Sequence, residues 1–342
     1  MNARKWVKRL WITFACVLVL VVGVGAWIVV QNDFAVREVQ VTIPGPKQPL
    51  KAVLALPTEG KGPRGLVVFA HGDGVADASG DEVYRPIWEA FARAGYASLS
   101  WNKPGVGGAP GNWLHQSMSD RSAEVDAALD WAKRQPEIDP NRLGVWGISQ
   151  GGWVLPKVAG DRTDLRFMIL VGAAVNWVRQ GEYNLRAELQ DQGAPAGKLD
   201  AELRRRAARL RLLEEGAAYD KYLASGLDNS PMSRDRWRFV LQNFRADVTD
   251  QLPKVRTPTL LMLGDHDRNV DVKETEATYR AGIPRGLLTV EKLRDSSHSA
   301  VKYELDNPDS VWGLITFVAA PRSIYVPGYL DSLTEFVKKH GR

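Results

Sequence analysis

Short apolar runs alternate with amphipathic stretches along the chain, and this alternation restricts the fold more than any other feature of the sequence. The runs lie at residues 66–70, 97–101, 142–146, 167–171, 259–263 and 287–293. Helical patterns separate them near 84–94, 119–134 and 272–281, and after Ser149. A continuous apolar run is typical of a strand buried on both faces, and helices between such strands connect them in parallel. The sequence therefore predicts an α/β fold with a mostly parallel, doubly wound sheet.

Two segments depart from this alternation. Residues 38–43 and 51–56 flank a turn rich in proline and glycine, which predicts an antiparallel pair at the start of the sheet. Between about 176 and 250 no apolar strand is visible and helical patterns dominate, so we expect a helical insertion there. Within it, an apolar stripe at helical spacing comprises Leu199, Leu203, Ala207 and Leu210.

The first thirty residues have the pattern of a membrane-spanning segment. Basic residues precede an uncharged stretch of 21 residues, Leu10 to Val30. As a helix this stretch would be about 31 Å long, close to the ~30 Å hydrocarbon core of a bilayer. The basic residues are Arg4, Lys5, Lys8 and Arg9. By the positive-inside rule they place residues 1–9 in the cytoplasm and predict a single-pass membrane protein, with the rest of the chain on the extracytoplasmic side.

A cleaved signal peptide is the competing interpretation, with Val24-Gly25-Ala26 as the processing site. Residues Trp27 to Val30 extend the apolar run beyond a usual signal core, which favours an uncleaved anchor. Cys16 is the only cysteine, so no intrachain disulfide is possible. The residues before Cys16 do not fit a lipoprotein cleavage box.

The charged residues do not indicate a nucleic-acid partner. The formal net charge is +5, but the basic residues are scattered apart from the N-terminus and one arginine cluster within 204–211. That cluster fits a solvated helix face, or else a surface that contacts anionic lipid or an anionic substrate. The sequence does not indicate an oligomeric state.

The stretch "GVWGISQGGW" at 144–153 predicts a sharp turn from a strand into a helix. Glycines at 147 and 151 leave room for such a bend, which would hold Ser149 in a strained conformation above the sheet. The serine would then lie at the amino end of the following helix, where the helix dipole favours negative charge. Ser149 is therefore the candidate nucleophile.

A serine hydroxyl needs a base, and the base needs an orienting acid. Of the five histidines, His298 follows the last clear strand and would reach the same edge of the sheet as Ser149, so we predict it as the base. The loop after 259–263 offers two acids. We predict Asp267 as the acid, because Asp265 follows the strand too closely to swing across and could instead support the turn.

A tetrahedral intermediate also requires two backbone N–H donors, and each is worth about 3 kcal/mol of barrier lowering. The N–H of Gln150, next to the nucleophile, is one candidate. The loop His71-Gly72-Asp73-Gly74 is expected to supply the other from Asp73, provided that its carboxylate points away from the developing oxyanion.

With these features in the order Ser149, Asp267, His298, the chain resembles the α/β-hydrolase superfamily, and within it bacterial esterases related to serine aminopeptidases and dienelactone-hydrolase-like enzymes. Further matches are "HGDG" at 71–74, "GYASLSWNKPGVGGAPGNW" at 95–113 and "LMLGDHDRNV" at 261–270. Relatives often have Asp-x-Arg-Gly-x-Gly where Trp101 to Gly107 stand here, so an ion pair found there in relatives does not carry over. The resemblance implies two core segments, 36–175 and 251–342, a helical cap at 176–250, and hydrolysis without a metal or organic cofactor.

The resemblance leaves several substrates open. Trp113, Trp153 and Trp177 are candidates to line a pocket for the acyl group of a small-molecule ester. Acids at the start of the cap could instead hold a free amine, as an aminopeptidase requires; they are Glu182, Glu188 and Asp191. Ester hydrolysis is the leading expectation, with peptide or thioester hydrolysis, or an inactive membrane-tethered binding protein, as alternatives.

Overall fold

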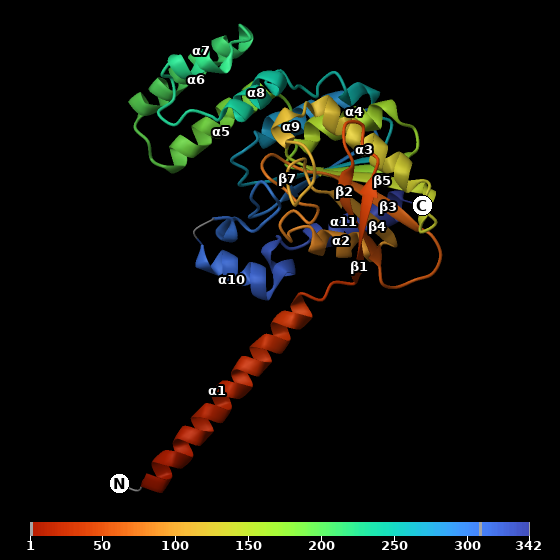
Figure 1. Cartoon of the computed structure of the whole chain (residues 1–342), viewed down its shortest axis with the longest axis vertical. Coiled ribbons are helices and arrows are strands. Elements are labelled where there is room, and N and C mark those ends of the chain that lie inside the picture. Colours follow the sequence, from red (N-terminus) through yellow and green to blue (C-terminus); the bar gives the residue numbers. More distant parts are fainter. Residues whose placement is uncertain (1–2, 308–309, 342) are drawn as a thin grey trace.

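The computed structural model describes residues 3–307 and 310–341, and its centre is one eight-stranded sheet (Figure 1). The strand order is β1-β2-β4-β3-β5-β6-β7-β8. The strands are β1 (Val36–Ile43), β2 (Leu50–Pro57), β3 (Arg64–Ala70), β4 (Tyr96–Trp101), β5 (Ile138–Ile148), β6 (Leu165–Val171), β7 (Thr259–Gly264) and β8 (Leu288–Leu293). Strand β2 pairs antiparallel with β1 and with β4, and the other pairs are parallel. The predicted α/β class and its antiparallel start are confirmed.

Helices bury both faces of the sheet, which explains why the strands read as continuous apolar runs. In β3, Leu66 and Val68 belong to one hydrophobic cluster, and Val67 and Phe69 belong to the other. The first cluster includes side chains from α3 (Met118–Ala132), α4 (Gly151–Asp161) and α9 (Val272–Gly282). The second includes side chains from α2 (Arg85–Ala92) and α11 (Tyr329–His340). Successive strand residues point to opposite faces, so each face requires apolar residues.

A helical insertion between β6 and β7 lies at the top of the molecule in Figure 1. It comprises α5 (Trp177–Asp191), α6 (Ala196–Glu214), α7 (Tyr219–Ala224) and α8 (Arg234–Asn243). The insertion has a small core of its own, in which the rings of Tyr222 and Trp237 stack 4.1 Å apart. At its base the Trp177 N–H donates to the Ala246 carbonyl, so the chain enters and leaves the insertion side by side. Of the predicted stripe on α6, Leu210 packs against this core and Ala207 is exposed.

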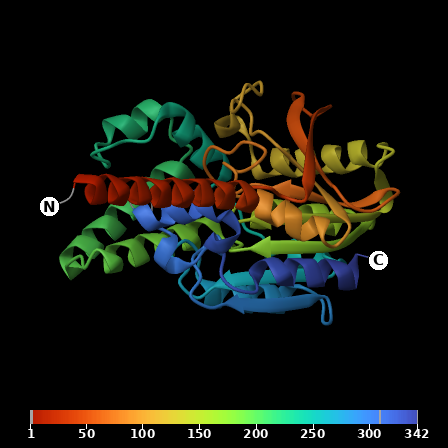
Figure 2. The same cartoon turned by 90° about the horizontal axis from the view of Figure 1, so that it is seen from below.

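The helix α1 (Ala3–Gln31) projects away from the rest of the molecule (Figures 1 and 2). Within the described residues, its segment Trp6–Gln31 is the one stretch long and apolar enough to cross a membrane. None of it is buried against the protein. A further apolar helix, α10 (Val311–Ala319), lies beside the end of α1 that joins the body.

Candidate active site

The turn between β5 and α4 holds Ser149 in a left-handed conformation, with φ at +54°. That region disfavours a residue with a Cβ, and a strained residue of this kind costs about 1–3 kcal/mol. The neighbouring glycines make the turn possible for a specific steric reason. A Cβ on Gly151 would lie 3.0 Å from the Ala70 carbonyl oxygen, and one on Gly147 would lie 2.7 Å from Leu155. The glycines therefore let the elbow pack against β3 and α4.

His298 and Asp267 form a hydrogen-bonded pair at the same edge of the sheet. The Nδ1 of His298 lies 2.7 Å from Oδ2 of Asp267, whose side chain is fully buried. The other carboxylate oxygen of Asp267 accepts the backbone N–H groups of Asn269 and Val270, at 2.7 and 2.9 Å. Because Nδ1–H donates to the carboxylate, Nε2 keeps a lone pair that can accept a proton.

In the loop between β6 and α5, a side chain at residue 172 would occupy the space that His298 needs. A Cβ on Gly172 would lie 2.8 Å from Nδ1 of His298 and 2.6 Å from its carbonyl oxygen. The second acid of the β7 loop has a different role: Asp265 accepts the Ser296 N–H at 3.0 Å and so supports the turn below His298.

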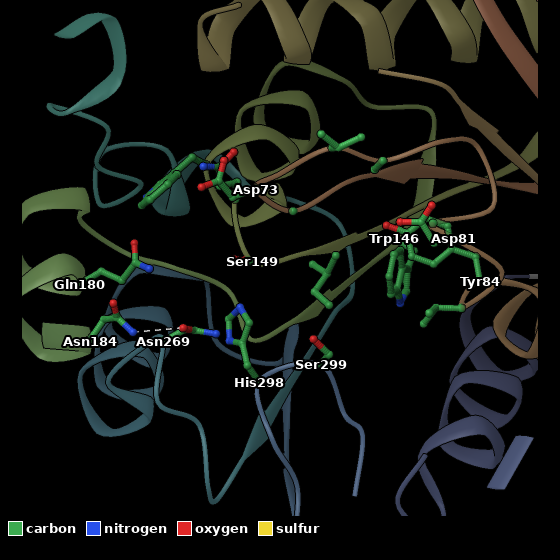
Figure 3. A pocket seen from close by; sticks show the side chains of 18 of the residues that line it. Asp73, Asp81, Tyr84, Trp146, Ser149, Gln180, Asn184, Asn269, His298 and Ser299 are labelled. Carbon is green, nitrogen blue, oxygen red and sulfur yellow. Dashed lines mark hydrogen bonds between the residues drawn. The ribbon is translucent and has the colours of Figure 1, made fainter. Parts of the chain in front are cut away.

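Ser149 and His298 line one cavity of about 540 Å³ between the sheet edge and α5 (Figure 3). Figure 3 shows the His298 ring pointing toward the turn that carries Ser149. About half of the other lining residues are apolar or aromatic: Val75, Ala76, Val83, Tyr84, Ile87, Trp146, Ile148, Trp153, Trp177 and Tyr325. The volume and lining are those of a pocket for a small organic molecule.

The structure separates the three tryptophans that we expected near a substrate. Trp153 and Trp177 line the cavity and stack on each other with ring centroids 5.0 Å apart. Trp113 is outside the set of residues that line this cavity, and it packs edge-on against Phe239 of α8 at 5.4 Å. The Nζ of Lys103 also lies over the Trp113 ring, 4.8 Å from its centroid.

Two buried cations hold the loop after β3 by its carbonyl oxygens. The Nζ of Lys103 donates to the carbonyls of Gly72 and Gly74, at 2.6 and 2.7 Å. A guanidinium nitrogen of Arg121 donates to the carbonyl of His71, and another donates to Oε1 of Gln150 at 2.9 Å. Burial lowers the pKa of Lys103 well below its usual value, and the nearby charge of Arg121 lowers it further.

This arrangement aims backbone N–H groups away from the cations. In a trans peptide the C=O and the following N–H point in opposite directions, so anchoring the Gly72 carbonyl turns the Asp73 N–H to the other side. Within the described chain, neither the Asp73 N–H nor the Gln150 N–H donates to a protein acceptor. Both residues line the cavity, which makes these two groups the candidate oxyanion donors.

The carboxylate of Asp73 is turned toward the cap. Its two oxygens accept from the guanidinium of Arg236 on α8, at 2.9 and 2.6 Å. Although burial acts to raise it, the pKa of Asp73 is lowered by these hydrogen bonds and the charge of Arg236. The negative charge of the Asp73 carboxylate is thus balanced by the guanidinium of Arg236.

His71, in the same loop, is a structural residue. Its Nε2 lies 2.7 Å from the Trp101 carbonyl and its Nδ1 lies 3.1 Å from the Tyr84 hydroxyl. Burial, together with the charge of Lys103, lowers its pKa to about 3. The imidazole is therefore neutral, with Nε2–H donating to the carbonyl.

Sequence reasoning missed Lys103, Arg121 and Arg236 as parts of this site. Lys103 lies in the segment that departs from relatives, and its spacing from the glycines of the loop gives no signal. Arg121 is on α3 and Arg236 on α8, so both reach the site only through tertiary packing.

Other charged groups that the sequence suggested lie outside the cavity. Glu182 pairs with Arg186 and Asp191 pairs with Arg268; neither they nor Glu188 lines the cavity. In the arginine cluster, Arg209 pairs with Asp228 and Arg206 donates to the Val178 carbonyl, so part of the cluster holds the cap together. The exposed residues Asp265, His266 and Asp295 are close enough to share a metal ion, but Asp265 already accepts a backbone N–H.

The fold and site define a hydrolase of the α/β class. Residues 61–299 match the family described as serine aminopeptidase, S33, and the chain belongs to that family. Among solved structures, an esterase of Pyrococcus furiosus is 17% identical with a TM-score of 0.56, over 90% of this chain and 92% of that one. The esterase domain of a Rhodothermus marinus protein is 18% identical with a TM-score of 0.52, over 90% of this chain and 100% of that one. At these identities the likeness shows the fold alone.

The chain is also similar to a further solved structure and to a short stretch of a curated protein. The Est1E protein of Butyrivibrio proteoclasticus, in a structure with ferulic acid, is 15% identical with a TM-score of 0.55, over 88% of this chain and 98% of that one. An uncharacterized 31.7 kDa protein of Escherichia coli is 32% identical over 63 residues, which is 18% of this chain. The match spans about a fifth, 22%, of the length of that curated relative.

Proposed function

We propose that the protein is a serine hydrolase that cleaves small carboxylic esters through an acyl-enzyme intermediate. The observation that carries the proposal is that a serine on a strained turn and a histidine paired with a buried carboxylate face one cavity. The three residues, Ser149, His298 and Asp267, come from loops after three different strands. A structural role would not require Ser149 and His298 to share a cavity.

In the proposed reaction Ser149 Oγ attacks the ester carbonyl carbon while Nε2 of His298 takes its proton. The Asp267 carboxylate holds the tautomer and stabilises the imidazolium. The N–H groups of Gln150 and Asp73 stabilise the oxyanion. His298 then gives the proton to the leaving alcohol, and water, activated by the same imidazole, hydrolyses the acyl-serine.

Labelling with a fluorophosphonate probe, followed by peptide mapping, tests this assignment. We expect the label on Ser149, and turnover of p-nitrophenyl acetate and butyrate that falls by at least about 10³-fold in Ser149→Ala. Ser332→Ala on α11 is the matched control and should keep full turnover. Undiminished turnover in Ser149→Ala would refute the proposal, and absence of both label and turnover in the wild type would favour an inactive binding protein.

Peptide hydrolysis is the second candidate, supported by the family and by one residue of the cavity. The Asp81 side chain lines the cavity and forms no ion pair within the described residues, so it could hold a free amino terminus. On this alternative, aminoacyl p-nitroanilides would be cleaved and Asp81→Asn would raise their KM without changing that of p-nitrophenyl butyrate.

We also propose that α1 is an uncleaved membrane anchor, with the hydrolase body on the extracytoplasmic side of a bacterial inner membrane. Its support is the length and apolarity of the helix, the absence of buried residues in its apolar segment Trp6–Gln31, and the basic residues that precede that segment.

A further inference from the structure

The helix α10 exposes an apolar surface that no other residue in the described part of the chain covers. Within the described residues, five of its side chains are about half exposed or more: Val311 at 67%, Trp312 at 71%, Leu314 at 64%, Ile315 at 46% and Val318 at 49%. They occupy one side of the helix, and Phe317 packs inward against the core. The helix carries no charged residue. A soluble surface helix ordinarily places polar residues on its outer side.

This surface is fixed beside the point where α1 meets the body. The side-chain amide of Asn32, directly after α1, donates to the Val318 carbonyl at 2.9 Å. Just after α10, Arg322 donates to the carbonyls of Gln31 and Asp33, and it forms two hydrogen bonds with the Glu89 carboxylate of α2, at 2.6 and 2.7 Å. Its guanidinium also lies 4.4 Å from the centre of the Phe34 ring. The Arg322 side chain thus joins the end of α1 to α2 of the body, three residues beyond the end of α10.

We propose that α10 is a second membrane contact, whose apolar side lies in the lipid interface of the leaflet from which the body emerges. The proposal rests on α1 being a membrane anchor. With nine residues, α10 is about 14 Å long, too short to span a hydrocarbon core of ~30 Å, so it would lie flat in the interface.

Lipid fits this position better than a protein partner does. An anchor that leaves the bilayer at Gln31 holds α10 near the membrane surface whatever else the protein binds. Tryptophan is favoured at the boundary between lipid and water, and Trp27 near the end of α1 and Trp312 on α10 are both exposed there.

The test uses the full chain, one copy per lipid nanodisc, with an environment-sensitive fluorophore on a single cysteine. The native Cys16 reports on α1. In a Cys16→Ser background, Leu314→Cys reports on α10, and Leu223→Cys on α7 of the cap is the matched control, since it is also an exposed helical leucine. Quenching is measured with nitroxide-labelled lipids and with aqueous iodide, and circular dichroism confirms that each variant is folded.

We expect the label at 314 to be quenched by a nitroxide near the lipid headgroups, to be protected from iodide, and to emit at shorter wavelength than the label at 223. A label at 314 that iodide quenches as freely as the one at 223, while Cys16 is still quenched by deep lipid nitroxides, overturns the inference and leaves the anchor standing. Loss of lipid quenching at Cys16 overturns both. Protection at 314 that requires two copies per disc also overturns it, in favour of self-association.

Discussion

Ser149 is the residue where the local conformation conflicts most clearly with the side chain. Its positive φ is held by the hydrogen bond from its N–H to the Val171 carbonyl and by the close packing of the glycines around it. The strain should therefore be measurable as a loss in the free energy of unfolding.

We predict that Ser149→Gly is more stable than Ser149→Ala by about 1 kcal/mol, because glycine adopts this conformation without a Cβ penalty. Both variants lack the hydroxyl, so the comparison separates strain from chemistry. Chemical denaturation of the two proteins in the same detergent measures the difference. Equal stabilities would mean that the turn is not strained.

His71 gives the molecule a specific sensitivity to acid. Its pKa is lowered from 6.5 to about 3 by burial and by the charge of Lys103, so the unfolded chain binds a proton that the folded protein excludes. The stabilisation is complete above about pH 6.5 and is lost as the pH falls toward 3, by an amount on the order of 4 kcal/mol.

We expect His71→Gln to flatten this dependence, because the amide can donate to the Trp101 carbonyl but does not titrate. Thermal midpoints of both proteins between pH 7 and 4 measure the effect. The wild type should lose more stability than the variant over this interval, and parallel curves would contradict the prediction.

At the residue scale, the sequence predicts which of the proposed catalytic residues lie at one edge of the sheet better than it predicts the side chains that hold the loops around them. Ser149, Asp267 and His298 follow strands whose ends must share one edge of a parallel sheet, so chain order alone brings them close. Lys103 and Arg121 act on carbonyl oxygens across a buried interior, and no local pattern indicates which backbone groups a long side chain will reach.

Among the elements, the loop after β3 depends most on its neighbours. It has no regular structure of its own, and its carbonyls are held by Lys103 from the loop after β4 and by Arg121 from α3. The direction of its N–H groups is therefore a property of three elements together.

We predict that Lys103→Met lowers kcat for p-nitrophenyl esters by about 10²-fold and changes KM little. Without Lys103 the Asp73 N–H would no longer point at the oxyanion, and that hydrogen bond contributes mainly in the transition state. Lys133→Met, on the partly exposed end of α3, is the control. Steady-state kinetics at saturating ester measure the effect. A raised KM with unchanged kcat would instead place Lys103 in substrate binding.

The elements also differ in how well the sequence predicts them. The strands of the sheet follow from their apolar runs, because burial on both faces leaves that pattern. The exposure of α10 does not follow from its sequence, because an apolar helix is ordinarily expected to be buried. In the structure five of its side chains are exposed.

For the whole molecule, the proposed anchor α1 would determine where the hydrolase works. If α1 is an uncleaved anchor, the full-length chain should remain with the membrane after a carbonate wash, because a spanning helix is not held by surface charge. Immunoblots of the pellet and the supernatant measure this. Release of a shortened chain would show cleavage near Val24-Gly25-Ala26, and release of the full-length chain would rule out a spanning helix.

Only residues 32–35 separate α1 from β1, and Arg322 ties that short connection to α2. If α1 spans a bilayer, a body attached so closely has little freedom to tilt or to rise from it. Its cavity would stay at a nearly constant height, and the esters within reach would be those that diffuse along the same membrane or dissolve in the thin layer of fluid above it. Compounds fixed to a more distant surface would not meet Ser149, however well they fitted the pocket.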